Sequence, residues 1–160
     1  MILFIDTTSK NSRIIFGEQA ADFISEKQSI ELPARVREIL GSTAAMPTAI
    51  GVMTGPGSFT GIRLGIAYAK GLAMGYNVPV IGINLFDFTD AQVAATNSGR
   101  GDFYVRRANV FEITDSLPED AVLIDKYYAA DAIDIVRRRL EFDNLGEVIP
   151  LYIRPSYAEK

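Results

Sequence analysis

Two short segments carry residue types that could bind a phosphate group, and the first of them is Asp6-Thr7-Thr8. It places a carboxylate and two hydroxyls at the end of an apolar run, and such oxygens can hold a hydrated Mg²⁺ beside a phosphate. Alternatively, Asp6 caps a local turn and the hydroxyls bond the nearby backbone. Because no neighbouring glycine would let a phosphate approach closely, these residues favour the local role.

The second segment is a glycine-rich run between a predicted strand and a predicted helix. A glycine turn that leads into a helix presents free backbone N–H groups to an anion. A P-loop, however, ends in Gly-Lys-Ser/Thr, whereas Gly61 is followed here by Ile62-Arg63, and Thr60 stands where a dinucleotide fingerprint needs glycine. The run therefore does not predict a nucleotide site. Its residues before the helix are Gly55, Pro56, Gly57, Ser58, Phe59 and Thr60.

Two residue types are absent, because the 160-residue chain contains no Cys and no His. Disulfides, thiolate nucleophiles, Ser-His-Asp and Cys-His hydrolysis and imidazole-bound zinc are thereby excluded. A net charge of -4 argues against tight binding to a nucleic acid by this chain alone. We expect no catalytic residue and no metal site. The N-terminus lacks a signal-peptide pattern and no apolar run spans a membrane, which predicts a cytoplasmic protein without membrane contacts.

The elements that position these segments follow an α/β pattern. Apolar runs predict strands at residues 2–6, 13–17, 20–25, 49–53 and 77–82, and periodicity predicts two helices, one capped by Ser29 and ending at Gly41, the other over residues 61–75. Three meandering strands, followed by alternating helices and strands with right-handed crossovers, match the ribonuclease-H-like unit.

The chain is expected to divide into two lobes. Residues 1–90 form a full ribonuclease-H-like lobe that carries the predicted interface helices. Residues 91–160 form a reduced second α/β lobe with strands at 92–96, 103–113 and 121–124 and a helix at 129–140. With about 70 residues this lobe is too small to bury much core unless it leans on the first.

The predicted helix 61–75 is apolar on two sides. One face, which carries Ile62 and Ile66, suits the chain's own sheet, and the other alternates glycines with Leu64, Tyr68 and Leu72. A helix of this kind needs two partners, and glycines let a second helix approach closely. The chain's own second lobe could cover this face, but because that lobe is small an intermolecular contact is favoured.

The glycine-rich run through Gly65, continued by Ala69-Lys70-Gly71-Leu72-Ala73, closely resembles the signature of the TsaB (YeaZ) family. Ile5-Asp6-Thr7-Thr8 is similar to the family's opening, and Pro150-Leu151-Tyr152-Ile153-Arg154 is similar to its C-terminal Pro-x-Tyr-x-Arg. The resemblance implies a bacterial, cytoplasmic member of the actin-like ATPase superfamily, here with a shortened second lobe.

In function, the resemblance implies a non-catalytic scaffold for tRNA modification. A TsaD-like paralogue transfers a threonylcarbamoyl group to the adenosine next to the anticodon, and a TsaE-like ATPase is the third component. ATP and Mg serve the wider complex rather than this chain, which meets tRNA only indirectly. The alternative is a nucleotide-dependent phosphotransferase, or another nucleotide-binding protein of the superfamily, that uses Asp6, Thr7 and Thr8.

The resemblance also implies which surface forms the heterodimer with the TsaD-like partner and a homodimer with a second copy. It is made by two helices, and the glycine-rich run with Arg63 is its structural signature. On this view Gly65→Arg abolishes association and leaves the monomer folded. The implied interface residues are Leu32, Val36, Leu40, Gly61, Leu64, Gly65, Tyr68 and Leu72.

Overall fold

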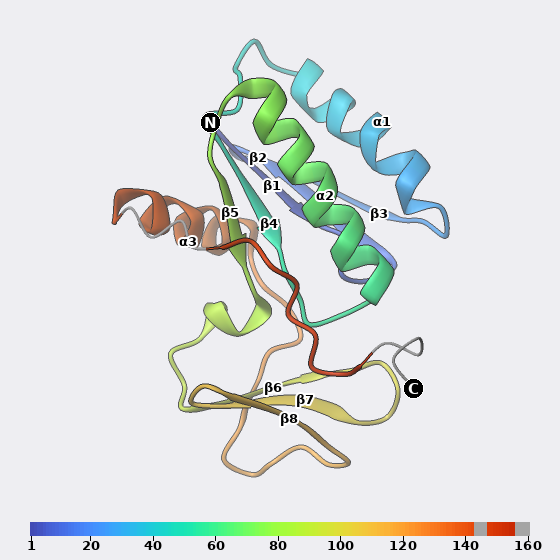
Figure 1. Cartoon of the computed structure of the whole chain (residues 1–160), viewed down its shortest axis with the longest axis vertical. Coiled ribbons are helices and arrows are strands. Elements are labelled where there is room, and N and C mark those ends of the chain that lie inside the picture. Colours follow the sequence, from blue (N-terminus) through green and yellow to red (C-terminus); the bar gives the residue numbers. More distant parts are fainter. Residues whose placement is uncertain (143–146, 156–160) are drawn as a thin grey trace.

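The structure is a computed structural model that describes residues 1–142 and 147–155 (Figure 1). Its larger sheet has five strands in the order β3-β2-β1-β4-β5. β1, β2 and β3 form an antiparallel meander, and β4 and β5 run parallel to β1. The strands are β1 (Ile2–Asp6), β2 (Asn11–Phe16), β3 (Gln19–Ile24), β4 (Ala49–Met53) and β5 (Val80–Ile83).

Helices cover both faces of this sheet. α1 (Gln28–Gly41) and α2 (Phe59–Tyr76) lie on one face, and α3 (Ala129–Glu141) lies on the other (Figure 1). Every residue of β1 and β4 is buried, as expected of strands between two helical layers. The three-layer arrangement and the strand order confirm the predicted α/β, ribonuclease-H-like fold. None of the helices described is long and apolar enough to cross a membrane.

The core is split by the sheet into two layers. Ile62, Ile66 and Leu32 belong to the layer under α1 and α2, which confirms that the β-branched face of α2 packs on the sheet. Ala132 and Val136 of α3 pack with strand residues on the opposite face.

A second, four-stranded sheet lies at one end of the first (Figure 1). The chain reaches it through the short 3₁₀ helix η1 (Leu85–Phe88), whose start is fixed by a capping box between Asn84 and Asp87. The strand order is β8-β7-β6-β9. Its strands are β6 (Val93–Asn97), β7 (Phe103–Arg107), β8 (Val110–Thr114) and β9 (Val122–Leu123).

The predicted division of the chain into two lobes at residue 90 does not match how the helices and sheets pack. The only helix within 91–142, α3, leaves the second sheet and packs on the first, where Ala132, Ile133 and Val136 are buried beside β1 and β5. The second sheet therefore has no helix of its own among the described residues. About 70 residues cannot bury a core alone, so the apolar face of α3 joins the larger one.

Two local predictions also need correction. α1 begins at Gln28 with Lys27 at its N-cap, so Ser29 lies inside the helix rather than capping it. Instead, the Ser25 hydroxyl accepts from the Lys27 backbone N–H and donates to Glu31. The single strand expected at residues 103–113 is a hairpin, β7 and β8, because Ala108 turns the chain with φ 50°.

Candidate functional site

The glycine signature packs the start of α2 onto the turn that follows β1. A Cβ at Gly65 would lie 2.5 Å from the Thr7 hydroxyl oxygen, and one at Gly61 would overlap the Thr7 carbonyl oxygen. A Cβ at Gly57 would likewise overlap the Thr8 carbonyl. The Thr7 hydroxyl donates to the Gly61 carbonyl at 2.7 Å. These glycines therefore allow the start of α2 to pack closely against the turn that follows β1.

The rest of the signature fixes the entry to α2. Gly55 has φ 125°, and a Cβ there would lie 2.7 Å from the Leu151 carbonyl oxygen. Pro56 is buried beside it. The Ser58 side chain caps the helix by accepting from the Gly61 N–H, while its own backbone N–H donates to the Thr8 carbonyl at 2.6 Å.

Four of the eight expected interface residues are buried within the chain itself. Leu32 and Val36 are buried between α1 and the sheet, and Gly61 and Gly65 are buried against Thr7. This corrects the expectation that they face a partner and that Gly65→Arg leaves the fold intact, because an arginine has no space there. Four of the expected residues stay partly accessible: Leu40, Leu64, Tyr68 and Leu72.

Asp6 is the hydrogen-bonding centre of the β1–β2 turn. Its Oδ1 accepts from the Thr8 backbone N–H at 2.9 Å and from the Thr8 hydroxyl at 2.7 Å. Its Oδ2 accepts from the Tyr127 hydroxyl at 2.7 Å. Asp6 is only 8% exposed, and both carboxylate oxygens are occupied. The predicted role of Asp6 as the cap of a local turn is confirmed, but the two hydroxyls do not bond the local backbone, because that of Thr8 donates to Asp6 and that of Thr7 to the Gly61 carbonyl of α2.

Tyr127 was missed by sequence reasoning. It lies 121 residues from Asp6, in the linker before α3, and no local pattern connects the two. Burial, with the nearby Asp6 carboxylate as a further cause, raises the pKa of Tyr127 well above its usual range. Tyr127 therefore stays a hydrogen-bond donor to Asp6.

Arg13 contacts both the ring and the backbone carbonyl of Tyr127. The Arg13 guanidinium lies 5.2 Å from the Tyr127 ring centroid and donates to the Tyr127 carbonyl at 2.9 Å. It also forms a two-pronged pair with Asp22, at 2.6 and 2.8 Å, and this hydrogen bonding lowers the pKa of Asp22. The tyrosine is thus held by Asp6 of β1 and Arg13 of β2, and Asp22 of β3 in turn fixes Arg13.

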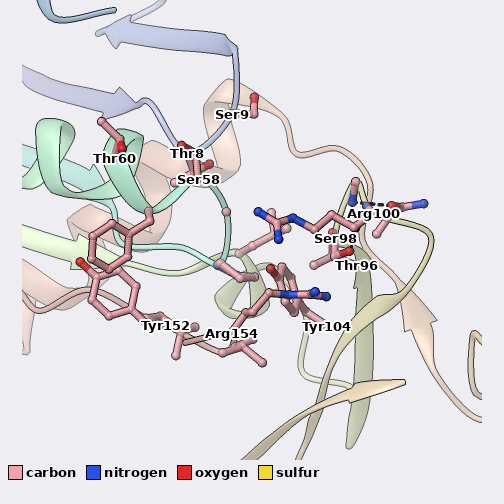
Figure 2. A pocket seen from close by; sticks show the side chains of 18 of the residues that line it. Thr8, Ser9, Ser58, Thr60, Thr96, Ser98, Arg100, Tyr104, Tyr152 and Arg154 are labelled. Carbon is pink, nitrogen blue, oxygen red and sulfur yellow. Dashed lines mark hydrogen bonds between the residues drawn. The ribbon is translucent and has the colours of Figure 1, made fainter. Parts of the chain in front are cut away.

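A cleft of about 910 Å³ lies between the two sheets (Figure 2). Hydroxyls of Thr8, Ser58 and Thr60 line it from the first sheet's side, and those of Thr96 and Ser98 from the second sheet's side. Asp6 is not among the lining residues. The cleft thus combines hydroxyls with the α2 N-terminus, a surface that suits an anionic group.

The C-terminal segment and the signature meet at the mouth of this cleft. Phe59 stacks on Tyr152 with ring centroids 4.7 Å apart, and the Arg63 guanidinium lies 5.3 Å from the Phe59 centroid. Within residues 1–142 and 147–155, no cluster of three or more acidic side chains could hold a metal ion. The polar groups that line the cleft are hydroxyls, Lys10, Asn97 and arginines, together with aromatic rings.

A family model described as "TsaD: tRNA N6-adenosine threonylcarbamoyltransferase" matches residues 25–106, just over half of the chain. The matched part begins before α1 and ends in β7. It thus contains both helices of one sheet face and the whole glycine signature.

Two curated relatives match shorter parts. The tRNA threonylcarbamoyladenosine biosynthesis protein TsaB of Escherichia coli K12 is 42% identical over 67 residues, which cover 40% of this chain and 29% of that protein. The tRNA N6-adenosine threonylcarbamoyltransferase of Clostridium beijerinckii is 34% identical over 112 residues, 61% of this chain and 31% of that protein. The matched segments span about a third of the length of these relatives.

Two solved structures share the fold. YeaZ from Pseudomonas aeruginosa superposes with a TM-score of 0.67 at 18% identity, over 94% of this chain and 98% of that one. A protein described as having similarity to peptidase YeaZ from Pseudomonas aeruginosa gives a TM-score of 0.62 at 17% identity, over 96% and 99% of the two chains. Because the family model matches just over half of the chain, the chain belongs to the TsaD family, and it shares its fold with YeaZ.

Proposed function

We propose that this chain is a non-catalytic subunit that binds a TsaD-like paralogue and supports threonylcarbamoyl transfer to the adenosine next to the tRNA anticodon. The family and the biosynthetic role named for the Escherichia coli relative support this proposal. The proposal concerns the whole protein's activity, of which the matched segments represent a third of the relatives' length.

The observation that carries the proposal is the outward face of α2. Leu64, Tyr68 and Leu72 are only half-buried, and they form an apolar strip one helical turn apart. Burial raises the pKa of Tyr68, so its hydroxyl is neutral at physiological pH. A Cβ at Gly71 or Gly75 would meet no atom of the described residues within 4 Å. These two glycines, rather than Gly61 and Gly65, leave room for another helix.

The residue types of the chain and the hydrogen bonds of Asp6 support the proposal that the subunit is non-catalytic. The sequence holds no Cys or His, and both Asp6 oxygens accept hydrogen bonds from Thr8 and Tyr127. A carboxylate occupied in this way has little capacity left for a hydrated cation. We further propose that ATP and Mg are used by the TsaD-like and TsaE-like partners, and that tRNA is met only indirectly.

The test is reconstitution with the TsaD protein of the same organism. Size-exclusion chromatography of the mixture should give a complex, and threonylcarbamoyl transfer to tRNA should increase when this chain is added. Separate elution, together with equal TsaD activity in its absence, contradicts the proposal. Light scattering of the chain alone will show whether the α2 face also forms the proposed homodimer.

The cleft supports one alternative, a nucleotide-dependent phosphotransferase. Thr8 and Ser58 line it at the N-terminus of α2, where a phosphate could enter. Calorimetry with ATP and Mg separates the two functions. The alternative requires saturable binding that Asp6→Ala abolishes, whereas the scaffold proposal predicts no heat of binding for the chain alone.

A further inference from the structure

The segment 151–154 lines the cleft and contacts both sheets (Figures 1 and 2). Its first contact is with the backbone at the end of β4. The Leu151 N–H donates to the Thr54 carbonyl at 2.8 Å, and the Leu151 carbonyl occupies the space beside Gly55. This end of the segment is thus anchored to the first sheet.

Tyr152 extends the anchor to α2. Its ring stacks on Phe59, in the first turn of that helix, with centroids 4.7 Å apart and planes 27° from parallel. Tyr152 is 42% exposed, so the pair is accessible from solvent and is not part of the main core.

Arg154 makes the opposite attachment, to the second sheet. It forms a salt bridge with Asp102, in the loop between β6 and β7, and its guanidinium lies 5.9 Å from the Tyr104 ring centroid. Asp102 also accepts from the Ser98 hydroxyl across the same loop. Tyr152 and Arg154 are two residues apart, so at most about 7 Å of chain joins the two attachments. The segment has little slack between the sheets.

The second sheet is also attached to η1 and to the linker that follows it. Arg106 of β7 donates to the backbone carbonyls of Phe86, Thr89 and Ala91, and Phe111 of β8 packs on Phe86 with ring centroids 5.7 Å apart. In the described residues, the extensive contacts between elements lie within the first sheet and its helices or within the second sheet, and none joins a strand of one sheet to a strand of the other. A small core forms at the junction around Phe86 and Tyr104, and Leu151 and Ile153 pack against it. The segment 151–154 therefore joins the two sheets together with the contacts of Arg106 and Phe86.

We propose that the segment 151–154 acts as a clasp that sets the position of the second sheet and, with it, the width of the cleft. Loss of either attachment leaves the second sheet held mainly by the contacts of Arg106 and Phe86, so that it moves over a wider range. Tyr152 attaches the segment to the first sheet and Arg154 attaches it to the second. Substitution of either residue therefore produces the same motion, although the two side chains contact different sheets. This inference concerns the isolated chain and does not depend on the proposed partner.

The absence of cysteine makes the motion directly measurable. Glu18→Cys, at the β2–β3 turn, and Ser116→Cys, after β8, place one spin label on each sheet at exposed positions. Double electron–electron resonance should give one narrow distance distribution in this background. Tyr152→Ala and Arg154→Met should each broaden it to at least twice its width. Phe142→Ala, at a 79% exposed aromatic residue beyond α3, and Arg138→Met, on the exposed side of α3, are the matched controls and should leave it unchanged.

A distribution that keeps its width in both clasp variants overturns the proposal, provided that circular dichroism shows them to be folded. If Arg154→Met fails to fold, Asp102→Asn removes the charge of the salt bridge from the other partner and must broaden the distribution. Equal broadening by the two control substitutions would also overturn it, because the junction would then respond to any surface change.

Discussion

The Thr7 hydroxyl lies beneath Gly65, so that a Cβ at Gly65 would stand 2.5 Å from its oxygen. The hydroxyl at the same time donates to the Gly61 carbonyl, one helical turn earlier. One threonine therefore explains two of the signature glycines. A substitution at Gly65 is therefore expected to disturb the interior of the chain rather than a surface that meets a partner.

The first prediction concerns these glycines. Gly65→Ala should destabilise the fold by about 1–3 kcal/mol, because the added methyl overpacks a buried contact. Gly71→Ala is the matched control in the same helix, where a Cβ meets no described atom, and it should stabilise by roughly 0.5–1 kcal/mol through helix propensity. Urea unfolding measures both. Similar values for the two variants would contradict the close approach at Gly65.

The second prediction tests the Thr7–Gly65 pair itself. Thr7→Ala alone should cost about 1 kcal/mol or more, because it removes the donor to the Gly61 carbonyl. In that background the space beside Gly65 is open, so adding Gly65→Ala should cost clearly less than it does in the unmodified chain. A double-mutant cycle from urea unfolding should give a favourable coupling of about 0.5–2 kcal/mol. Strict additivity would show that the two residues do not share the contact.

The third prediction concerns the outward face of α2. Leu72→Arg should weaken binding to the TsaD-like partner by about 2 kcal/mol or more, because it places a charge in the centre of the proposed apolar contact. Leu117→Arg introduces the same change at another partly exposed leucine, beyond β8, and should leave affinity unchanged. Calorimetric titration of each variant with the partner gives the comparison. Equal weakening by both would remove α2 from the interface.

The fourth prediction concerns Tyr127 and alkaline pH. Its pKa in the folded chain is raised above the value of about 10 expected in the unfolded chain. The folded state therefore holds the proton more tightly, and stability is lost as the pH rises above about 10. Tyr127→Phe removes this loss, although at neutral pH it costs about 1–3 kcal/mol by leaving an Asp6 oxygen without its donor.

Urea unfolding between pH 8 and pH 11 checks this sign. The unmodified chain should lose stability more steeply than Tyr127→Phe, and the two curves should converge as the pH rises. Tyr128→Phe is the control, because the neighbouring tyrosine is 81% exposed and its removal should leave the slope unchanged. Parallel curves for Tyr127→Phe and the unmodified chain would contradict a buried, neutral Tyr127.

Much of the fold was predictable because its signals are local. Apolar runs in β1 and β4 and the period of α2 depend only on neighbouring residues, and the predicted succession of elements in the first sheet and the sheet-facing residues of α2 are confirmed. The cap of α1 and the β7–β8 turn were missed because Ser25 and Ala108 act through short-range geometry that propensities describe poorly. The candidate site was only half predictable, since its glycines are visible in the sequence and Tyr127 is not.

The sequence by itself determined the element order, the glycine signature and the residues that share each face of α2. Only the tertiary structure decided what each face meets. Helical periodicity places Gly65 and Leu72 together, but the path of the chain brings Thr7 under Gly65 and leaves Leu72 accessible. In the same way, the crossover into α3 carries Tyr127 to Asp6. Contacts between residues far apart in the chain depend on how the layers pack, which no local pattern records.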